Sequence, residues 1–332
     1  MTEKTDLQRR QLLGATIAFA LPSISTAQSV AVMPQPAFSS YRFIVGFGAG
    51  GVPDAASRVI AAKISERWKI PALVENKLGA GGMLAAQAVL AAPPDAMTIL
   101  SITPAHATAP AIYKKVPYDS LKDFSPVTLI GEGPAIIVVP NDSKFKTLAD
   151  LIQYAKANPG KLSYSSAGVG SSSHFATALM CQQASIDALN IPYKSIGEAL
   201  TETMAGRVDF HIAPYVSAIK LVKSGKLRAL AGTGLKRLVD LPEVPTASES
   251  GVSGYEWNFW YGFLVSSKTP ASQIDLLHRD LTNILRLPDV SKHIQEMGVN
   301  VSSKSPEEFK KLLESEVLKY ARIAKIANIQ PE

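Results

Sequence analysis

Two glycine-rich loops of this chain have the composition of anion-binding sites. The first, Gly46-Phe-Gly-Ala-Gly-Gly-Val-Pro-Asp54, follows the apolar run Arg42–Val45, and the second, Ala167-Gly-Val-Gly-Ser-Ser-Ser-His174, follows Leu162–Ser166. Each loop precedes a segment with helical periodicity. Loops of small residues leave backbone N–H groups unpaired at a helix start, where the helix dipole favours negative charge. We therefore expect the two loops to bind one small anion from opposite sides.

The first loop also fits the dinucleotide-binding pattern G-x-G-x-x-G, and Glu75 ends a second apolar run further along the chain. Pro53 argues against this interpretation, because proline prefers the first helical turn and the helix then starts after the glycines. Asp54 would cap that helix with a carboxylate, which would repel a pyrophosphate. A secreted NAD-dependent oxidoreductase that uses Gly46–Gly51 stays the alternative to a binding function. We also expect positive φ at Gly51, so that a side chain there would block the anion.

The run Ser171-Ser-Ser-His174 invites a hydrolase interpretation, but the residues around it do not support one. The chain has no G-x-S-x-G motif, and no nearby Asp or Glu is placed to orient His174. Serine hydroxyls at a helix start are typical caps. The other histidines show no metal-ligand spacing with Cys, Asp or Glu; they are His106, His211, His278 and His293. We expect no enzyme activity, no metal and no cofactor.

Polar or small residues at other strand ends are further candidates for the same cleft. Gly79-Ala-Gly-Gly82 is either a tight turn or a wall of the cleft, and Thr103 follows the strand next to the first loop. Trp260 belongs to an aromatic run that would favour a ligand with a flat or apolar part. The candidate ligand-binding residues are Phe47, Gly48, Ala49, Gly50, Gly51, Asp54, Thr103, Ser166, Ala167, Gly170, Ser171, Ser172, His174, Tyr193, Ala213, Tyr215 and Trp260.

Alternating strands and helices must position these loops. At 332 residues the chain predicts about two domains. The alternation after residue 40 is typical of βαβ units with parallel strands and right-handed crossovers. The expected strands are Arg42–Val45, Ala72–Glu75, Thr98–Ile102, Val127–Ile130, Ala135–Val139, Leu162–Ser165, Ala188–Pro192, Val208–Ala213, Leu227–Gly232 and Tyr255–Val265. The expected helices are Ala55–Lys69, Met83–Ala91, Leu148–Ala157, Phe175–Gln183, Ile196–Ala205, Pro214–Lys223, Pro270–Leu285 and Pro306–Ala327.

Composition narrows the function classes. With 46% apolar and 19% charged residues the chain is typical of globular proteins. The net charge of +6 is spread over the sequence without a basic block, which argues against nucleic-acid binding. A mild positive field suits a small acidic ligand.

The N-terminus has the features of a secretory signal peptide. Arg9-Arg10 precede the apolar run Leu12–Leu21, and Ser25-Thr-Ala27 has small residues at the positions that a signal peptidase recognises. The apolar run is too short to span a bilayer. We expect cleavage near Ala27 and a loose leader over residues 28–40. Gln8–Leu13 resembles a twin-arginine signal, although paired basic residues occur in ordinary signal peptides too.

A set of motifs, in a fixed order, carries a resemblance to a known family. They are Phe47-Gly-Ala-Gly-Gly-Val-Pro-Asp54, Val74-Glu-Asn-Lys-Leu-Gly-Ala-Gly-Gly82, Tyr113-Lys-Lys-Val-Pro-Tyr-Asp119, Lys122-Asp-Phe-Ser-Pro-Val127, Tyr154-Ala-Lys-Ala-Asn-Pro-Gly-Lys-Leu162, Ser165-Ser-Ala-Gly-Val-Gly170, Ile191-Pro-Tyr-Lys194, Gly225-Lys-Leu-Arg-Ala-Leu230 and Leu241-Pro-Glu-Val-Pro-Thr246. With these motifs the chain resembles, from Tyr41 to about Ile329, the tripartite tricarboxylate transporter receptor family, the Bug or TctC-like periplasmic solute-binding proteins.

The resemblance implies an α/β, two-lobed periplasmic-binding-protein fold of the type II kind, with a ligand cleft between lobes joined by two crossing strands. Residues 41–133 plus 257–332 would form the first lobe, and residues 134–256 the second. The cleft would close on a small carboxylate: a di- or tricarboxylate, an amino acid or an aromatic acid. The loops Phe47–Asp54 and Ser165–His174 would hold it. The resemblance further implies a monomer in the periplasm whose partner is a tripartite membrane transporter or a sensor.

Two departures from the family pattern bear on the ligand. The first loop usually carries Pro-Pro-Gly-Gly, where this chain has Gly48-Ala-Gly-Gly51. The strand before Pro214 often ends in Phe-Asp in the family, and here it ends in Ile212-Ala213. Loss of that carboxylate disfavours a ligand with an amine at this wall.

Overall fold

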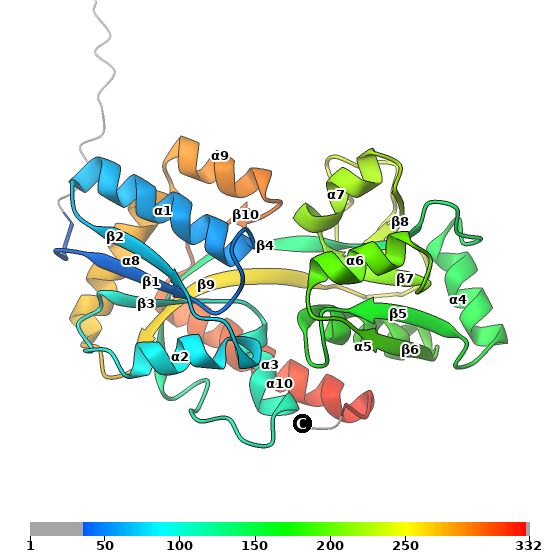
Figure 1. Cartoon of the computed structure of the whole chain (residues 1–332), viewed down its shortest axis with the longest axis horizontal. Helices are drawn as coiled ribbons and strands as arrows, with labels where there is room; N and C mark the ends of the chain where they lie inside the picture. The colour runs from blue at the N-terminus through cyan, green and yellow to red at the C-terminus, as the bar shows by residue number, and fades with distance from the viewer. Residues whose placement is uncertain (1–35, 330–332) are drawn as a thin grey trace, which may run out of the picture. The chain divides into compact units, whose positions relative to one another are not determined.

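The computed structural model describes residues 36–329 (Figure 1), so the predicted signal peptide and most of the predicted leader lie outside the described residues. These residues form one mixed sheet of ten strands, with the order β2-β1-β3-β9-β4-β7-β5-β6 and with β8 and β10 each paired to β4. The strands are β1 Tyr41–Val45, β2 Ala72–Asn76, β3 Thr98–Ile102, β4 Phe124–Pro140, β5 Leu162–Ser166, β6 Ala188–Pro192, β7 Phe210–Pro214, β8 Leu227–Gly232, β9 Asn258–Ser266 and β10 Asn300–Val301.

Parallel pairing occurs in two separate groups of strands, as the βαβ pattern predicts. β1 pairs with β2 and β3 in one group, and β5 pairs with β6 and β7 in the other. We call these the first and the second strand group. The strands between them, β4 and β9, are antiparallel to their neighbours and to each other. The sheet is therefore mixed, with its antiparallel strands in the middle.

β4 passes from the first strand group to the second without interruption. The sequence predicted two separate strands, Val127–Ile130 and Ala135–Val139. That prediction is wrong, because the backbone from Gly131 to Pro134 stays paired with β9. Gly131 and Gly133 are needed because the backbone from Gly298 to Asn300, at the start of β10, passes too close to leave room for a Cβ.

The chain changes pairing partners at one level of β4. Up to Pro134 the strand pairs with β9, and from Ala135 onward it pairs with β7 and β8. At the same level Trp257 N donates to Thr233 O at 3.0 Å, and Thr233 Oγ1 donates to Trp257 O at 2.6 Å. The predicted lobe boundaries at 133/134 and 256/257 fall at this change of partner, and the division into lobes stays a prediction.

The helices fill the crossovers and cover the sheet. They are α1 Val52–Trp68, the short 3-10 helix η1 Ala80–Gly82, α2 Met83–Leu90, α3 Ala105–Ile112, α4 Leu148–Ala157, α5 Ser172–Ala184, α6 Ile196–Met204, α7 Tyr215–Lys223, α8 Ala271–Leu285, α9 Pro288–Glu296 and α10 Pro306–Ile326. The sequence did not predict α3 or α9. In α3 the two prolines resemble helix breakers, but Pro104 precedes the first turn, where proline is tolerated, and Pro110 is accommodated within the helix.

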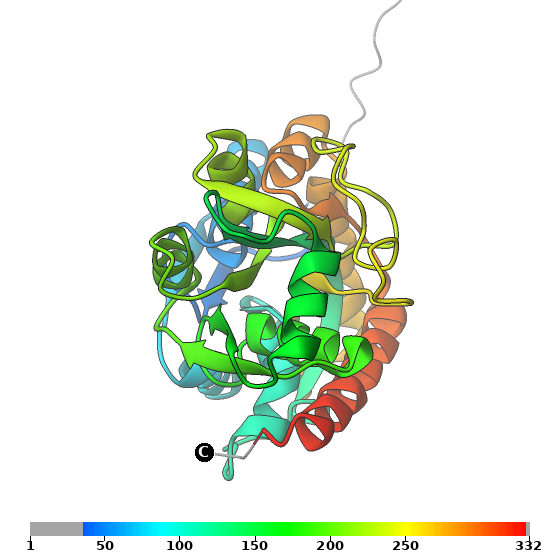
Figure 2. The same ribbon diagram turned by 90° about the vertical axis from the view of Figure 1, so that its right-hand side faces the viewer.

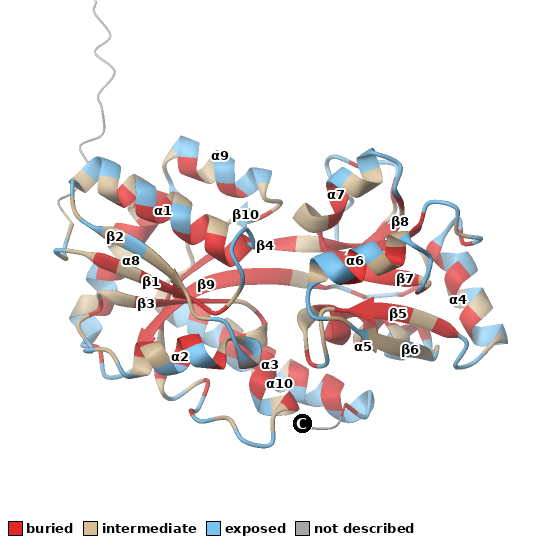
Figure 3. Ribbon diagram, viewed as in Figure 1, coloured by how far each residue is buried: buried red, intermediate tan, exposed pale blue. Residues whose placement is uncertain are grey.

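The aromatic run in and before β9 belongs to the core. Figure 3 shows β4 and β9 as almost entirely buried, and Trp257 is 0% exposed. Trp260 is 2% exposed; its indole N–H donates to Glu316 at 2.9 Å and its ring packs edge-on against Phe309. The prediction that Trp260 contacts the ligand is therefore wrong, since α10 covers this side of β9.

Within residues 36–329, no helix combines the length and the apolar character needed to cross a membrane.

Candidate functional site

The first glycine loop is exposed at the carboxyl end of β1. Gly48, Ala49, Gly50 and Gly51 all face solvent, and among the described residues the amides of Gly48 and Ala49 have no acceptor. Gly51 caps α1 with φ −70°, so the predicted positive φ at Gly51 is wrong. The left-handed conformation lies one residue earlier, at Gly50, with φ +83°. The loop thus offers the free N–H groups of Gly48 and Ala49 beside the unpaired amides of the first turn of α1.

A buried carboxylate holds this loop in place. Asp54 is 2% exposed and accepts from Gly50 N at 2.9 Å, from Arg58 Nε at 3.1 Å and from Asn76 Nδ2 at 2.8 Å. Asn76 also donates to Phe47 O at 2.9 Å. Burial alone would raise the pKa of Asp54, but the hydrogen bonds from Arg58, Gly50 and Asn76 lower it below its usual value. Asp54 caps the loop as the sequence suggested, and its bonds are made to protein groups, which makes it a positioning residue.

The second glycine run packs behind the first loop. A Cβ on Gly46 would lie 2.6 Å from Gly82 Cα, so the two backbones approach more closely than any side chain allows. The ring of Phe47 covers Gly82, where a Cβ would lie 3.6 Å from the ring. Gly79, Gly81 and Gly82 all have positive φ. The run is a tight turn that also lines a small pocket, and its place as a wall of the ligand cleft stays a prediction.

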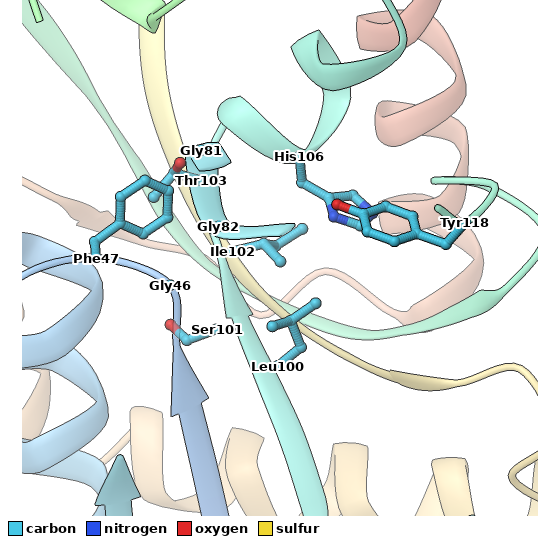
Figure 4. A pocket seen from close by; sticks show the side chains of 10 residues that line it. All are labelled: Gly46, Phe47, Gly81, Gly82, Leu100, Ser101, Ile102, Thr103, His106 and Tyr118. Atoms are coloured by element: carbon cyan, nitrogen blue, oxygen red, sulfur yellow. The ribbon is translucent and has the colours of Figure 1, made fainter. Parts of the chain in front are cut away.

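That pocket lies beside the first loop, and its cavity of about 10 Å³ leaves room for about one water molecule (Figure 4). It is lined by Gly46, Phe47, Gly81, Gly82, Leu100, Ser101, Ile102, Thr103, His106 and Tyr118. His106 stacks on Tyr118 with ring centroids 5.8 Å apart, and its Nε2 lies 3.0 Å from Ser120 O. Burial lowers the pKa of His106 to about 4, so the ring is neutral at pH 7. The pocket is thus lined by neutral groups, with hydroxyls and an imidazole as its polar side chains.

The second loop satisfies more of its own amides than the sequence predicted. Gly170 N donates to His174 Nδ1 at 3.0 Å, Ala167 N donates to Ser173 Oγ at 3.0 Å, and Ser171 Oγ caps α5. Among the described residues, the amides of Gly168 and Val169, and those of Ser172 and Ser173 in the first turn of α5, have no acceptor. Each loop therefore presents several free N–H groups next to a helix start.

His174 is the neutral counterpart of Asp54. It is 8% exposed, and burial lowers its pKa to about 4. At neutral pH its Nδ1 carries no proton and accepts the Gly170 amide, so the Nε2 atom carries the hydrogen. This bond also occupies the atom that a serine nucleophile would need, which is a further argument against the hydrolase interpretation.

The end of α3 lies between the second loop and the glycine run Gly79–Gly82. Gly170 of the second loop packs against Ile112 so closely that no Cβ fits, and a Cβ on Gly81 would lie 3.2 Å from the Tyr113 hydroxyl. The second loop and the run behind the first loop therefore contact one segment, which sequence reasoning missed. The only signal was that Tyr113 begins one of the family motifs.

The remaining candidates divide into those beside the loops and those in the core. Thr103 lines the pocket, and Tyr193 N donates to Ser166 O at 2.9 Å, which sets Tyr193 beside the second loop. Ser172 Oγ, at the start of α5, accepts from the indole of Trp257 at 3.3 Å.

Two candidates near β7 have structural surroundings. Ala213 is 0% exposed and packs among core side chains such as Ile136 and Leu200, so its prediction as a ligand contact is wrong. Tyr215 donates a short hydrogen bond to Asp240, and its ring lies over Gly298, where a Cβ would not fit.

The geometry suits an anion held by backbone dipoles. Neither loop contains Lys or Arg. Within residues 36–329 no group of three His, Cys, Asp or Glu side chains is placed to hold a metal. Free amides at the starts of two helices favour oxygen atoms that carry negative charge.

Comparison with known proteins gives one consistent result. Residues 56–329 match the family described as "Tripartite tricarboxylate transporter family receptor". The "UPF0065 protein in tcbD-tcbE intergenic region" of Pseudomonas sp. (strain P51) is 35% identical over 320 residues, which is 96% of this chain and 94% of that protein.

Three solved structures are similar over most of this chain. "R. palustris Rpa4515 with adipate" shares 31% identity with a TM-score of 0.81 and covers 88% of this chain and 98% of its own. "Structure of periplasmic binding protein BugD" shares 30% identity with a TM-score of 0.78, with 88% and 99% covered. "MatC (Rpa3494) from Rhodopseudomonas palustris with bound malate" shares 28% identity with a TM-score of 0.76, with 86% and 98% covered. The predicted α/β periplasmic-binding-protein fold is confirmed by these similarities.

Proposed function

Because this chain belongs to the tripartite tricarboxylate transporter receptor family, whose members are solute-binding proteins and not enzymes, we propose that it is an exported receptor for a small dicarboxylate. The observation that carries the proposal is the pair of glycine loops, each with free amides and neither with a cationic side chain. Each of two carboxylate groups would meet the free amides of one loop. The adipate and malate in two of the similar structures belong to the same chemical class.

We propose that the ligand is held by dipoles instead of ion pairs. Each charge-assisted hydrogen bond contributes about 1.5–3 kcal/mol. Four such bonds, less the cost of ordering the ligand, are enough for micromolar affinity, which corresponds to about −8 kcal/mol. Arg58 does not serve as a direct partner in this proposal, since its guanidinium is bonded to Asp54 and Asn76.

Among the described residues, no Asp or Glu lines the pocket beside the first loop, and the Asp54 carboxylate is already bonded to Gly50, Arg58 and Asn76, so an ammonium group would find no free carboxylate there. This favours a dicarboxylate over an amino acid. The pocket beside Phe47, with its neutral lining and room for about one water molecule, suits a water that bridges the protein to the ligand.

Closure of the two strand groups around the ligand is the proposed working motion. A ligand that contacts both loops stabilises the closed state by its differential affinity for that state. We propose that a tripartite membrane transporter or a sensor binds the closed form. The proposed location is the periplasm, after cleavage of a signal peptide near Ala27.

Isothermal titration calorimetry with a matched pair of variants tests the proposal. The panel contains adipate, malate, citrate, benzoate, glutamate and NAD, and we expect saturable binding of a dicarboxylate without turnover. Gly48→Val should abolish this binding, because Gly48 is exposed, has no atom within 4 Å of a Cβ and lacks a positive φ, so that the variant should fold normally.

Lys77→Ala serves as the control, since Lys77 lies near the loop but its ammonium faces Glu75 at 3.7 Å. We expect it to bind as the wild type does. Stabilisation by NAD with no response to any carboxylate would refute the receptor function. Unchanged affinity in Gly48→Val would remove the first loop from the site.

A further inference from the structure

A groove between α5 and α10 lies outside the candidate site. The two helices are neighbours in Figures 1 and 2, and the rings of Phe175 and Tyr320 lie 5.2 Å apart between them. The cavity within the groove has a volume of about 170 Å³ and opens to solvent, which is close to the engineered apolar cavity of about 150 Å³ that binds benzene. It is lined by Ala178, Leu179, Gln182, Gln183, Lys319, Arg322, Ile323 and Ile326.

Each helix contributes one face to this groove. On α10 the lining positions are separated by three and four residues, from Lys319 through Arg322 to Ile326, so they share a face. On α5, Ala178 and Gln182 are four residues apart and share a face too. The lining is therefore continuous along both helices and combines apolar and polar side chains.

The apolar floor of the groove is accessible. Ile326 is 49% exposed and Leu179 is half-buried, although both belong to types that normally pack inside. Ile323, with 5% exposure, closes the floor beneath them. An apolar chain that covered these side chains would remove them from water.

Among the described residues that line the groove, Arg322 is the one cation without a bonded partner. Lys319 is engaged, since it bonds to Glu316 at 3.1 Å and lies 4.6 Å from the centre of the Trp257 ring. Arg322 is exposed and, among the described residues, has no hydrogen bond or ion pair. The side-chain amides of Gln182 and Gln183 are exposed as well, and no Asp or Glu lines the groove.

We propose that this groove binds an amphipathic monocarboxylate, an acid with one carboxylate and a linear apolar chain. The carboxylate meets the Arg322 guanidinium, which presents a planar fork of donors to two oxygens, and the neighbouring glutamine amides. The chain lies on Leu179, Ile323 and Ile326. This site shares no residue with the loops, so the proposal does not depend on the proposed dicarboxylate receptor function.

Calorimetric titration of sodium octanoate into the mature chain tests the site, with octylamine as the probe of opposite charge. We expect saturable binding of octanoate at one site, both in the absence and in the presence of saturating adipate. Octylamine should not bind. Arg322→Glu should weaken octanoate binding about tenfold or more, because the variant places like charges together.

Lys325→Glu is the matched control, since it makes the same charge change on the same exposed side of α10 and does not line the groove. We expect its affinity for octanoate to stay within about twofold of the wild type, as for other screened surface charges. Ala178→Met provides a second variant, which should block the groove by filling its floor while circular dichroism reports an unchanged fold.

Four outcomes would overturn the proposal. They are the absence of saturable octanoate binding, equal binding by Arg322→Glu, competition between octanoate and adipate, and saturation by an acidic amphipathic helical peptide where octanoate fails. The third would assign octanoate to the loops, and the fourth would assign the groove to a protein partner.

Discussion

The two glycine loops present the same kind of group, free amides at a helix start, but they are held by different chemistry. Asp54 holds the first loop through a charged network with Arg58 and Asn76. His174 holds the second loop as a neutral acceptor for the Gly170 amide. The first loop is open, with no atom within 4 Å of a Cβ at Gly48 or Gly50, whereas the second is packed against Ile112 at Gly170. The two loops therefore have similar sequences, but a charged network holds the backbone of one and a neutral acceptor holds the backbone of the other.

This difference has a consequence for pH. Asp54 has a lowered pKa, so the stability that it contributes is present above its unfolded value and is lost only as the pH falls through the lower folded value. His174 also has a lowered pKa, but from 6.5 to about 4. Its contribution is complete above pH 6.5 and is lost as the pH falls toward 4. The second loop should therefore loosen at a higher pH than the first.

The largest difference between the loops should appear at their glycines. Gly170→Ala places a methyl group against Ile112 and forces a non-glycine residue to φ +73°. We expect it to lower the free energy of unfolding by about 2–4 kcal/mol. Gly48→Ala in the first loop should change it by less than about 0.5 kcal/mol. Urea denaturation of both variants measures the contrast, and equal stabilities would mean that the loops are packed alike.

The charged network of the first loop should give the next largest effect. Asp54→Ala leaves the Gly50 amide and the Asn76 amide without their acceptor in a buried position. We expect a loss of about 2–3 kcal/mol, less than for a fully buried ion pair because Arg58 is half exposed and can be solvated. Asp54→Asn keeps one acceptor and should lose less. A loss below that of His174→Ala would reverse the proposed ranking of the two loops.

Removal of the neutral acceptor in the second loop should lower the free energy of unfolding by less than Asp54→Ala does. His174→Ala should lower stability by about 1–2 kcal/mol and weaken dicarboxylate binding, because the Gly170 amide loses its partner. His174→Asn can place its Oδ1 near the former Nδ1 atom and should restore much of both properties. Failure of His174→Asn to recover affinity, with a normal fold, would show that the ring itself contacts the ligand.

The smallest effect is the dependence on pH. We compare the binding free energy of the wild type with that of His174→Asn at each pH. The advantage of the wild type should be constant above pH 6.5 and should fall by about 1 kcal/mol toward pH 4. Protonation of the ligand is common to both proteins and cancels in this difference. Calorimetry at several pH values measures it, and a flat difference would mean that protonation of His174 does not affect the loop.

Much of the fold could be predicted from the sequence because local patterns determine it. Thr98–Ile102, Ala188–Pro192 and Leu227–Gly232 were predicted with their observed bounds, since each is an apolar run between turn residues. The unbroken course of β4 could not be predicted, because its glycines are required by a distant segment and read locally as a turn.

The site shows the same limit. Small residues before a helix start indicate both loops, and Asp54 was predicted as a cap from its position alone. The role of Ile112 and the partner of the Gly170 amide depend on packing between segments far apart in the sequence. Trp260 illustrates the opposite error, since an aromatic strand is as typical of a core as of a ligand pocket, and only Glu316 on α10 decides between them.

The continuity of β4 also bears on how the chain unfolds. Its first part completes the sheet of one strand group and its second part completes the other, so neither group has all its backbone partners without the same strand. Peeling β4 away would expose unpaired N–H and C=O groups on both sides at once. The chain should therefore unfold in a single cooperative transition, and a protease cut at the level of Pro134 should release no independently folded half.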